Sequence, residues 1–345
     1  MRRRSFLGGL GTAGLVATAG CLASGLFETT TSRAPPLVEP RPTGVYVPTH
    51  SESMGMVGTG SVGDLRVRVG YSYPHRFWTI EQDGDGFRAQ QVEVAPDDAV
   101  HLMATPFDPE TGQVIPDTGL SVEVYRDGDL VTQEVIYRML SQQMGFHYGA
   151  NFPLDGDGSY EVRVSIAGVD LPRFGAFEGR FAEPGTASVA FDYSERDRND
   201  LSYRLLEDEQ GQTGALSGME MAGGIAPDLP GDALGRGTVD DVRLVAARVT
   251  ADRFGDAPYL AVSARTPYNR YVVPRMGLSA SVPEAGFEGR LSPALDPELG
   301  FHYGAAVEGL APDASVTATV DVPSTVARHE GYETAFLETG SVELG

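Results

Sequence analysis

Lysine is absent from this chain of 345 residues, and arginine supplies all 26 of its basic side chains. The 48 acidic residues outnumber them and give a formal net charge of -22 at pH 7. Nucleic-acid binding requires clustered Lys and Arg that displace counterions from phosphate, so this composition excludes that class of protein. Concentrated salt screens the repulsion among so many carboxylates, and we therefore expect a halophilic source.

Cysteine is nearly absent as well. The single thiol, Cys21, follows three arginines, an uncharged run of 13 residues from Leu7 to Ala19, and a glycine. Because about 20 apolar residues are needed to span a bilayer, the run is typical of a signal peptide rather than of a permanent membrane helix. Arg3 and Arg4 followed by Ser-Phe-Leu resemble a twin-arginine export signal, and the residues ending at Cys21 resemble a lipobox.

These features predict an exported protein at the outer face of the cytoplasmic membrane, anchored to the membrane by a lipid on Cys21. The alternative is a free, buried cysteine. Either way, one cysteine cannot form an intramolecular disulfide, so the fold depends on packed cores, and a metal site must use ligands other than thiolates.

Helical periodicity is scarce, whereas short alternating apolar runs recur between turns rich in Gly, Pro and Asp. The runs at 65–71, 100–104 and 120–124 place apolar residues at every second position, which is the period of a half-buried strand. Only 199–206 has a helical pattern. Short strands at this spacing predict an all-β fold of two immunoglobulin-like antiparallel β-sandwiches joined by a linker.

A repeated sequence divides the chain into two similar halves. Residues 145–150 read GFHYGA, and residues 300–305 read GFHYGA again. Around them, 100–104 aligns with 242–246 and 176–179 with 328–331, which indicates a duplicated domain. We therefore predict a signal at 1–21, a tether at 22–43, a metal-binding-like sandwich at 44–195, a linker with a short helix at 196–237 and a second, degenerate sandwich at 238–345.

Histidine and methionine, which can bind soft or borderline metals, are concentrated in the first half. His101 and Met103 lie two residues apart on a predicted strand, which projects both side chains from one face. His147 follows Met139 and Met144 across a short loop. Two histidines with two methionines make a neutral site suited to Cu(I) and tolerated by Cu(II). The alternative is that the methionines fill a core and that the histidine of GFHYGA serves a structural turn.

From residue 44 to about 193, the sequence resembles the periplasmic iron-transport-associated metal-binding family. Members of that family are dimeric, copper-binding immunoglobulin-like β-sandwiches linked to iron uptake. The resemblance rests on His-Tyr-Gly-Ala-Asn at 147–151, on a methionine shortly before it and on His101 in the first histidine position. Spacing and resemblance together give copper, iron or both as the metal, and as candidate ligands His101, Met103, Met139, Met144 and His147.

The chain departs from the family pattern at several positions. Met103 replaces a glutamate, Leu140 stands at the methionine position beside Met139, and Phe177 replaces the last histidine. In the second half, the ligand positions hold Arg243, Val245 and Leu295, and the remaining histidines are His302 and His329. We therefore expect the first half alone to bind metal.

The sequence holds no Gly-x-Ser-x-Gly elbow, His-Glu-x-x-His helix or phosphate loop, so we expect no enzymatic activity. Aromatic residues gather at 71–78, which indicates the edge of a core, with a binding surface as the alternative. Our hypothesis is a lipid-anchored protein that binds copper or iron for an iron uptake system, with an iron permease as its partner. The alternative is a scaffold of two sandwiches that docks a partner and binds no metal.

Overall fold

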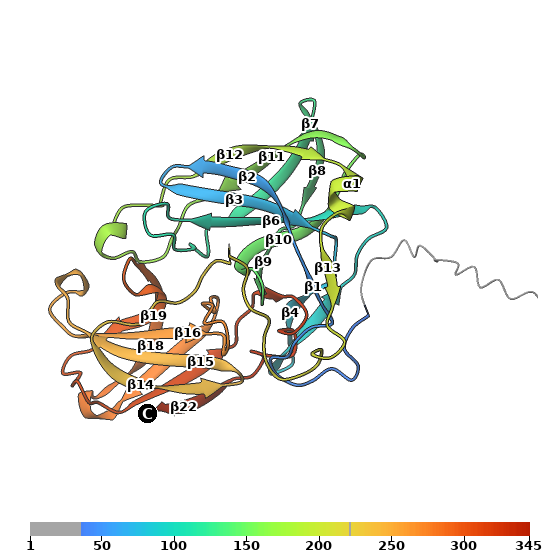
Figure 1. Ribbon diagram of the computed structural model, residues 1–345. Coiled ribbons are helices and arrows are strands. Elements are labelled where there is room, and N and C mark those ends of the chain that lie inside the picture. Colours follow the sequence, from blue (N-terminus) through green and yellow to red (C-terminus); the bar gives the residue numbers. More distant parts are fainter. Residues whose placement is uncertain (1–35, 221) are drawn as a thin grey trace, which may run out of the picture. The chain divides into compact units, whose positions relative to one another are not determined.

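Residues 36–345, apart from Met221, are described by the computed structural model (Figure 1). The predicted signal peptide, Cys21 and most of the tether lie outside the described residues, so those assignments stay predictions. In the part of the chain that is described, no helix is long and apolar enough to cross a membrane.

The first half of the chain forms an antiparallel β-sandwich. Its larger sheet has the strand order β2-β3-β6-β10-β9-β21-β4-β5, and its smaller sheet has the order β12-β11-β7-β8. The strands of the larger sheet are β2 (Gly55–Val62), β3 (Leu65–Ser72), β4 (Phe77–Asp83), β5 (Gly86–Val92), β6 (Asp98–Phe107), β9 (Tyr137–Ser141), β10 (Gly145–Pro153) and β21 (Ala327–Arg328). Those of the smaller sheet are β7 (Leu120–Arg126), β8 (Asp129–Glu134), β11 (Gly158–Ile166) and β12 (Gly185–Tyr193).

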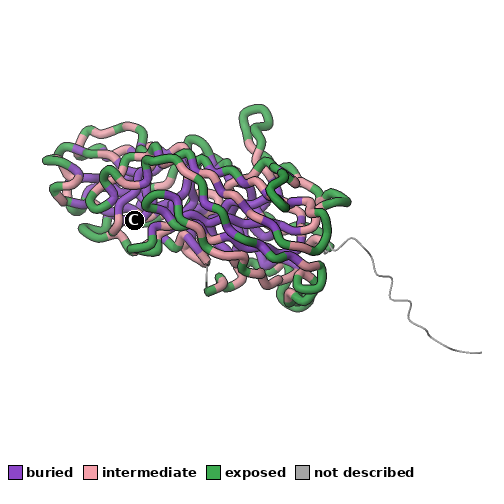
Figure 2. The backbone as a smooth tube through the Cα atoms, turned by 90° about the horizontal axis from the view of Figure 1, so that it is seen from above, coloured by how far each residue is buried: buried purple, intermediate pink, exposed green. Residues whose placement is uncertain are grey.

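Alternation along β6 decides which side chains enter the core of this sandwich. Val100, Leu102 and Ala104 are buried in the hydrophobic core. Because successive side chains of a strand point to opposite faces, His101 and Met103 lie together on the other face of the larger sheet. Figure 2 shows the buried residues gathered in the interior of the described chain and the exposed residues mainly along its periphery.

The second half forms another β-sandwich, so the predicted all-β fold with two sandwiches is confirmed. Its strand order is β14-β15-β16-β19-β18-β17-β20-β22. Strand β18 serves both sheets, because 287–291 pairs with β17 and 292–296 pairs with β19. The strands are β14 (Asp232–Val239), β15 (Val242–Val249), β16 (Tyr259–Arg265), β17 (Gly277–Val282), β18 (Phe287–Asp296), β19 (Gly300–Ala306), β20 (Val316–Val322) and β22 (Gly340–Leu344).

A short segment of each half pairs with a strand of the other half. Strand β21 comes from the second half but lies in the larger sheet of the first sandwich, beside β4 (Figure 1). It runs parallel to β9, with Ala327 opposite Met139. In the reverse direction, Arg173 of the first half forms a parallel bridge with Leu295 of β18.

The structure corrects the predicted helix. The α-helix α1 covers Glu195–Asn199, because the side chain of Ser194 caps it by accepting from the backbone N–H of Asp197 at 3.0 Å. The predicted helical region 199–206 instead contains β13 (Tyr203–Leu205), which pairs with β1 (His50–Glu52). The remaining helical elements are the short 3-10 turns η1 (Gly175–Phe177), η2 (Asp252–Phe254) and η3 (Pro283–Ala285).

The predicted linker contains ordered, packed chain. Strand β14 begins at Asp232, inside the range 196–237, and Leu206 and Ala226 of that range are buried. The buried apolar residues of this range occur singly among glycines and prolines. They have no regular spacing, so the sequence pattern does not predict that they pack.

The described N-terminal segment packs against the chain that follows β21. The backbone N–H of Tyr46 donates to the carbonyl of Gly331 at 3.2 Å, and the Tyr46 hydroxyl donates to the buried carboxylate of Glu333. The guanidinium of Arg41 lies 5.2 Å from the ring centroid of Trp78 on β4. These contacts fix both segments over the outer face of the larger sheet.

Candidate metal centre

The predicted ligands lie on the face of the larger sheet that is turned away from the core of the first sandwich. His101 of β6 is paired with Asn151 of β10, and His147 of β10 is paired with Met139 of β9. Met103 follows His101 at the next position on the same face. The period of two therefore predicted the shared orientation of His101 and Met103 correctly.

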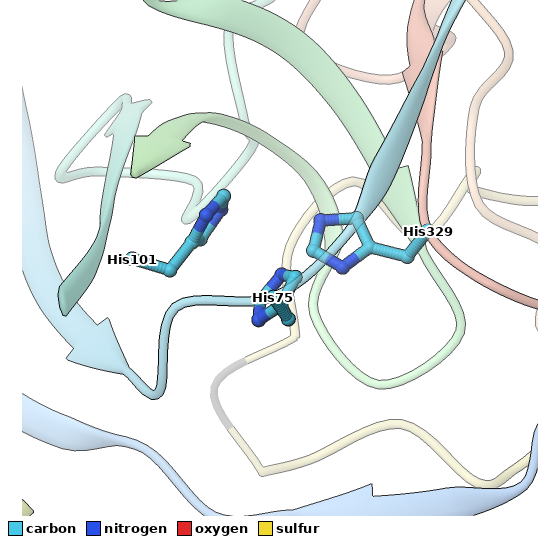
Figure 3. Close-up of side chains that lie close together, drawn as sticks. All are labelled: His75, His101 and His329. Carbon is cyan, nitrogen blue, oxygen red and sulfur yellow. The ribbon is translucent and has the colours of Figure 1, made fainter. Parts of the chain in front are cut away.

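Two further histidines reach this face from outside the predicted set (Figure 3). His75 lies in the loop between β3 and β4, and His329 directly follows β21. The ring centroid of His75 is 4.1 Å from that of His101 and 4.7 Å from that of His329. One ring nitrogen from each of these three lies within 4.8 Å of the others. His147 completes the group, 5.1 Å from His329 between ring centroids.

We call His75, His101, His147 and His329 the histidine chamber. In three of them, an oxygen acceptor fixes the ring proton on Nδ1. His101 Nδ1 lies 2.8 Å from the side-chain oxygen of Asn151. In His75 and His147, Nδ1 lies 2.9 and 3.2 Å from the carbonyl oxygen two residues earlier in the chain. Carbonyl oxygens only accept hydrogen bonds, so Nδ1 donates and Nε2 keeps its lone pair.

All four histidines of the chamber have a buried Nε2 atom without a hydrogen-bond partner among the described residues. A buried polar atom left unpaired costs about 1–3 kcal/mol. Most buried polar atoms are paired for this reason, and several unpaired ones in one place indicate a missing ion or other partner. A metal ion that accepts the four lone pairs would satisfy all of them together.

Burial keeps three imidazoles of the chamber, those of His101, His147 and His329, unprotonated. The pKa of His147 is lowered to about 4, and the pKa values of His101 and His329 are lowered well below 6.5, chiefly because burial removes water from the charged form. The nearby ring of His75 lowers all three pKa values further. These imidazoles are therefore neutral at pH 7, which is the form that binds metals.

Met139 is the methionine that borders the chamber. A Cβ atom on Gly149 would lie 2.6 Å from His101 Nε2 and 3.1 Å from Met139 Sδ, so both atoms lie over this glycine. Met139 is also the residue directly opposite His147. Its neighbour Leu140 points to the opposite face and belongs to the core of the sandwich. Met139, rather than Leu140, therefore places a thioether on the ligand face.

Met103 and Met144 lie further along the same face. Both line a cavity of about 80 Å³ whose wall also includes His75 and His329. Both side chains are buried, at 4% and 8% exposure. The structure thus brings His101, His147 and Met139 to the chamber and places Met103 and Met144 along the cavity that leads to it.

The position of His329 depends on its neighbour Arg328. The buried guanidinium of Arg328 donates to the carbonyls of Ser324 and Phe336 at 2.7 and 2.9 Å. The backbone N–H of His329 then donates to the carbonyl of Leu140 at 3.1 Å. These hydrogen bonds attach His329, which is remote in sequence, to the larger sheet that carries His101 and His147.

Sequence reasoning missed His75 and assigned His329 to the other half. His75 lies in the aromatic segment 71–78, whose composition indicates the edge of a core, and a loop has no period that predicts where its side chain points. No alternating pattern could reveal His329, because β21, which positions it, has only two residues.

The second half carries a counterpart of the chamber that is filled. GFHYGA of β19 pairs with β16 in the same register as GFHYGA of β10 with β6, which puts Tyr259 at the position of His101. The Tyr259 hydroxyl donates to His302 Nε2 at 3.2 Å, and His302 Nδ1 donates to the Gly300 carbonyl at 3.0 Å. His302 therefore has both ring nitrogens paired, unlike His147.

Two of the predicted alignments are wrong. The counterpart of β6 is β16 and not the strand at 242–246, so Arg243 does not occupy the first histidine position. The counterpart of His329 is Phe174 and not Phe177, because Phe174 makes the equivalent backbone bond to β18. Neighbouring strands of one sheet have similar apolar alternation, which is why the pattern alone could not select the right one.

Comparisons with known proteins give a structural likeness and a family. Two solved structures of FetP from uropathogenic Escherichia coli strain F11, one as isolated and one a copper-bound variant, are 19% and 21% identical to this chain. Each match covers 41% of this chain and 97% of the other, with TM-scores of 0.28 and 0.29. A comparison with curated proteins finds no match. The family model described as "Domain of unknown function (DUF7350)" matches residues 56–189 and 227–345, more than half of the sequence, and the chain therefore belongs to that family.

Proposed function

We propose that the protein binds a copper ion in the histidine chamber, through Nε2 of its four histidines with the Met139 sulfur beside them. The observation that carries this proposal is the set of four buried Nε2 atoms without a partner among the described residues. The hydrogen bonds on Nδ1 support it, because metal-binding imidazoles usually donate their other N–H to a fixed acceptor.

The donor set fits copper. Imidazole suits Zn, Cu, Fe and Ni, and a neighbouring thioether adds a preference for Cu(I). Among divalent first-row metals, a site of this kind binds Cu(II) most tightly. Ca²⁺ and Mg²⁺ need oxygen ligands, which the four imidazoles do not offer. Bound copper would supply one-electron chemistry, while the surrounding protein holds it, buries the site and keeps the imidazoles of His101, His147 and His329 neutral.

We further propose that the protein is an exported lipoprotein of an iron uptake system and passes metal to an iron permease. The signal-like residues before Cys21 and the resemblance of 147–151 to the iron-transport-associated family support this part. Changing Cys21→Ser tests the anchor. We expect the variant to be released from membranes as a folded protein, and continued fractionation with membranes would exclude lipidation as the anchor.

Copper titration of matched histidine variants tests the binding site. His147 and His302 occupy the same position of the repeated GFHYGA, but only His147 has a free Nε2. We expect wild-type protein to bind one equivalent of Cu(II) at high salt, His147→Ala to lose it and His302→Ala to keep it. If wild-type protein takes up no copper after metal-free preparation and reloading, the two sandwiches are a scaffold instead.

A further inference from the structure

A row of residues across four strands alternates methionine with glycine next to the chamber. Met56 of β2 is opposite Gly70 of β3, Gly70 is opposite Met103 of β6, and Met103 is opposite Gly149 of β10. Directly opposite residues share one face of a sheet. The glycine between the two methionines has no side chain, so the space above it is open to their thioethers.

Methionine side chains occupy that space. A Cβ atom on Gly70 would lie 2.2 Å from the terminal methyl carbon of Met54 and 3.9 Å from the sulfur of Met56. Any larger residue at position 70 would therefore displace Met54. The glycine has an extended backbone within β3, so its role here is close packing with a thioether rather than a turn.

Four methionines surround a small cavity at this place. The cavity has a volume of about 10 Å³ and is lined by Met54, Met56, Met103 and Met144, together with Arg68, Gly70 and Thr105. A volume of this size holds a single water molecule or ion. Arg68, its only charged lining residue, keeps its guanidinium 4.0 Å from the ring centroid of Phe107. We call this space the methionine cavity.

We propose that the methionine cavity is a second metal site, which binds Cu(I) through thioether sulfurs alone. Thioethers are soft ligands that select Cu(I) over harder cations. They carry no proton between pH 4 and 8, so the site differs from the imidazole chamber in metal oxidation state and in its response to pH. The inference rests on the proposed copper function, which it deepens by naming the oxidation state that each site takes.

The methionine cavity lies between solvent and the histidine chamber. Met56 is 45% exposed at its outer side. Met54, Met103 and Met144 line both this cavity and the larger one whose wall includes His75. A Cu(I) ion bound by these sulfurs would therefore lie beside the cavity whose wall includes His75 and His329.

Ag(I) titration of protein with ¹³C-methyl-labelled methionine tests this site. Ag(I) has the charge and softness of Cu(I) without its oxidation, and nitrate replaces chloride as the salt because chloride precipitates Ag(I). We expect one equivalent to shift the methyl signals of Met54, Met56, Met103 and Met144. The signal of Met276, buried in the second sandwich, is the internal control and stays unchanged.

A double variant separates this site from the chamber. Leu has nearly the volume of Met, so Met54→Leu with Met56→Leu keeps the packing. We expect Ag(I) affinity to fall at least 100-fold while Cu(II) uptake by the chamber stays at the wild-type level, and Met276→Leu to change neither. Unmoved methyl signals, or equal Ag(I) affinity in the double variant, would refute the thioether site. Cu(II) binding that survives in His147→Ala would refute the chamber and leave the Ag(I) result unaffected, so the two proposals fail independently.

Discussion

Phe174 and His329 are structural counterparts. The backbone N–H of Phe174 donates to the carbonyl of Leu295 at 2.9 Å, as that of His329 donates to Leu140 at 3.1 Å. Phe174 lies 4.7 Å from the ring centroid of Phe254, and His329 lies at the same 4.7 Å from His75.

The two clusters thus share one geometry with different chemistry. Phe254 stacks on Tyr259 at 4.3 Å between ring centroids, and His75 stacks on His101 at 4.1 Å. In the cluster at the second sandwich, the rings of Phe174, Phe254 and Tyr259 replace three imidazoles and offer no metal-binding nitrogen. The tyrosine hydroxyl pairs the one histidine that remains. This arrangement explains why only one of the two clusters has free Nε2 atoms.

We predict that Tyr259→Phe destabilises the protein by about 1–2 kcal/mol, because it leaves His302 Nε2 buried without a donor. Chemical unfolding at fixed salt measures the change. Tyr268→Phe, at a side chain that is 49% exposed, is the control and should have little effect. Equal stability of Tyr259→Phe and wild type would show that the hydroxyl does not stabilise His302.

We predict that Asn151→Ala weakens copper binding about 10- to 100-fold although Asn151 is not itself a ligand. Its side-chain oxygen accepts from His101 Nδ1 at 2.8 Å, and its amide donates to the carbonyl of His75 at 3.0 Å. The change frees the ring of His101 and loosens the loop of His75. Competition titration with a copper chelator measures the affinity, with Ser165→Ala on the exposed face of β11 as control. Unchanged affinity would mean that Asn151 does not position these ligands.

Acidification should destabilise the metal-free protein between about pH 6.5 and pH 4. Burial lowers the pKa of His147 and His302 to about 4, whereas an imidazole in the unfolded chain has a pKa of about 6.5. Between these values the unfolded chain binds more protons, so the free energy of unfolding falls as pH falls and levels off below the folded pKa. Each group contributes roughly 3 kcal/mol.

His302→Gln isolates one of these titrations. We expect the difference in unfolding free energy between pH 7 and pH 4.5 to shrink by roughly 2 kcal/mol relative to wild type. Denaturant unfolding at the two pH values measures it. An identical loss in both proteins would contradict the lowered pKa of His302.

The alternating pattern of the sequence predicted the fold and half of the chamber. The period of two placed His101 and Met103 on one face, and the repeated GFHYGA identified His147 as the distinctive histidine. Both features are local, so they can be read from neighbouring residues.

The rest of the chamber depends on contacts that local patterns do not contain. His75 is positioned by hydrogen bonds from a loop, and His329 reaches the site because β21 pairs with β9 and β4 across the whole length of the chain. Pairing between strands that are remote in sequence depends on how both halves pack as a whole, so a local pattern does not predict it. The alignment error that favoured Arg243 over Tyr259 has the same cause, because only the observed strand pairing distinguishes β15 from β16.

X-ray absorption at the copper edge of the loaded protein tests the account most directly. The scattering from the outer atoms of each imidazole ring gives the number of imidazoles that bind the metal. We predict four imidazoles in the wild-type spectrum and three in His329→Ala, with His302→Ala identical to wild type. A spectrum without imidazole scattering, or one that His329→Ala leaves unchanged, would contradict a copper site shared between the two halves of the chain.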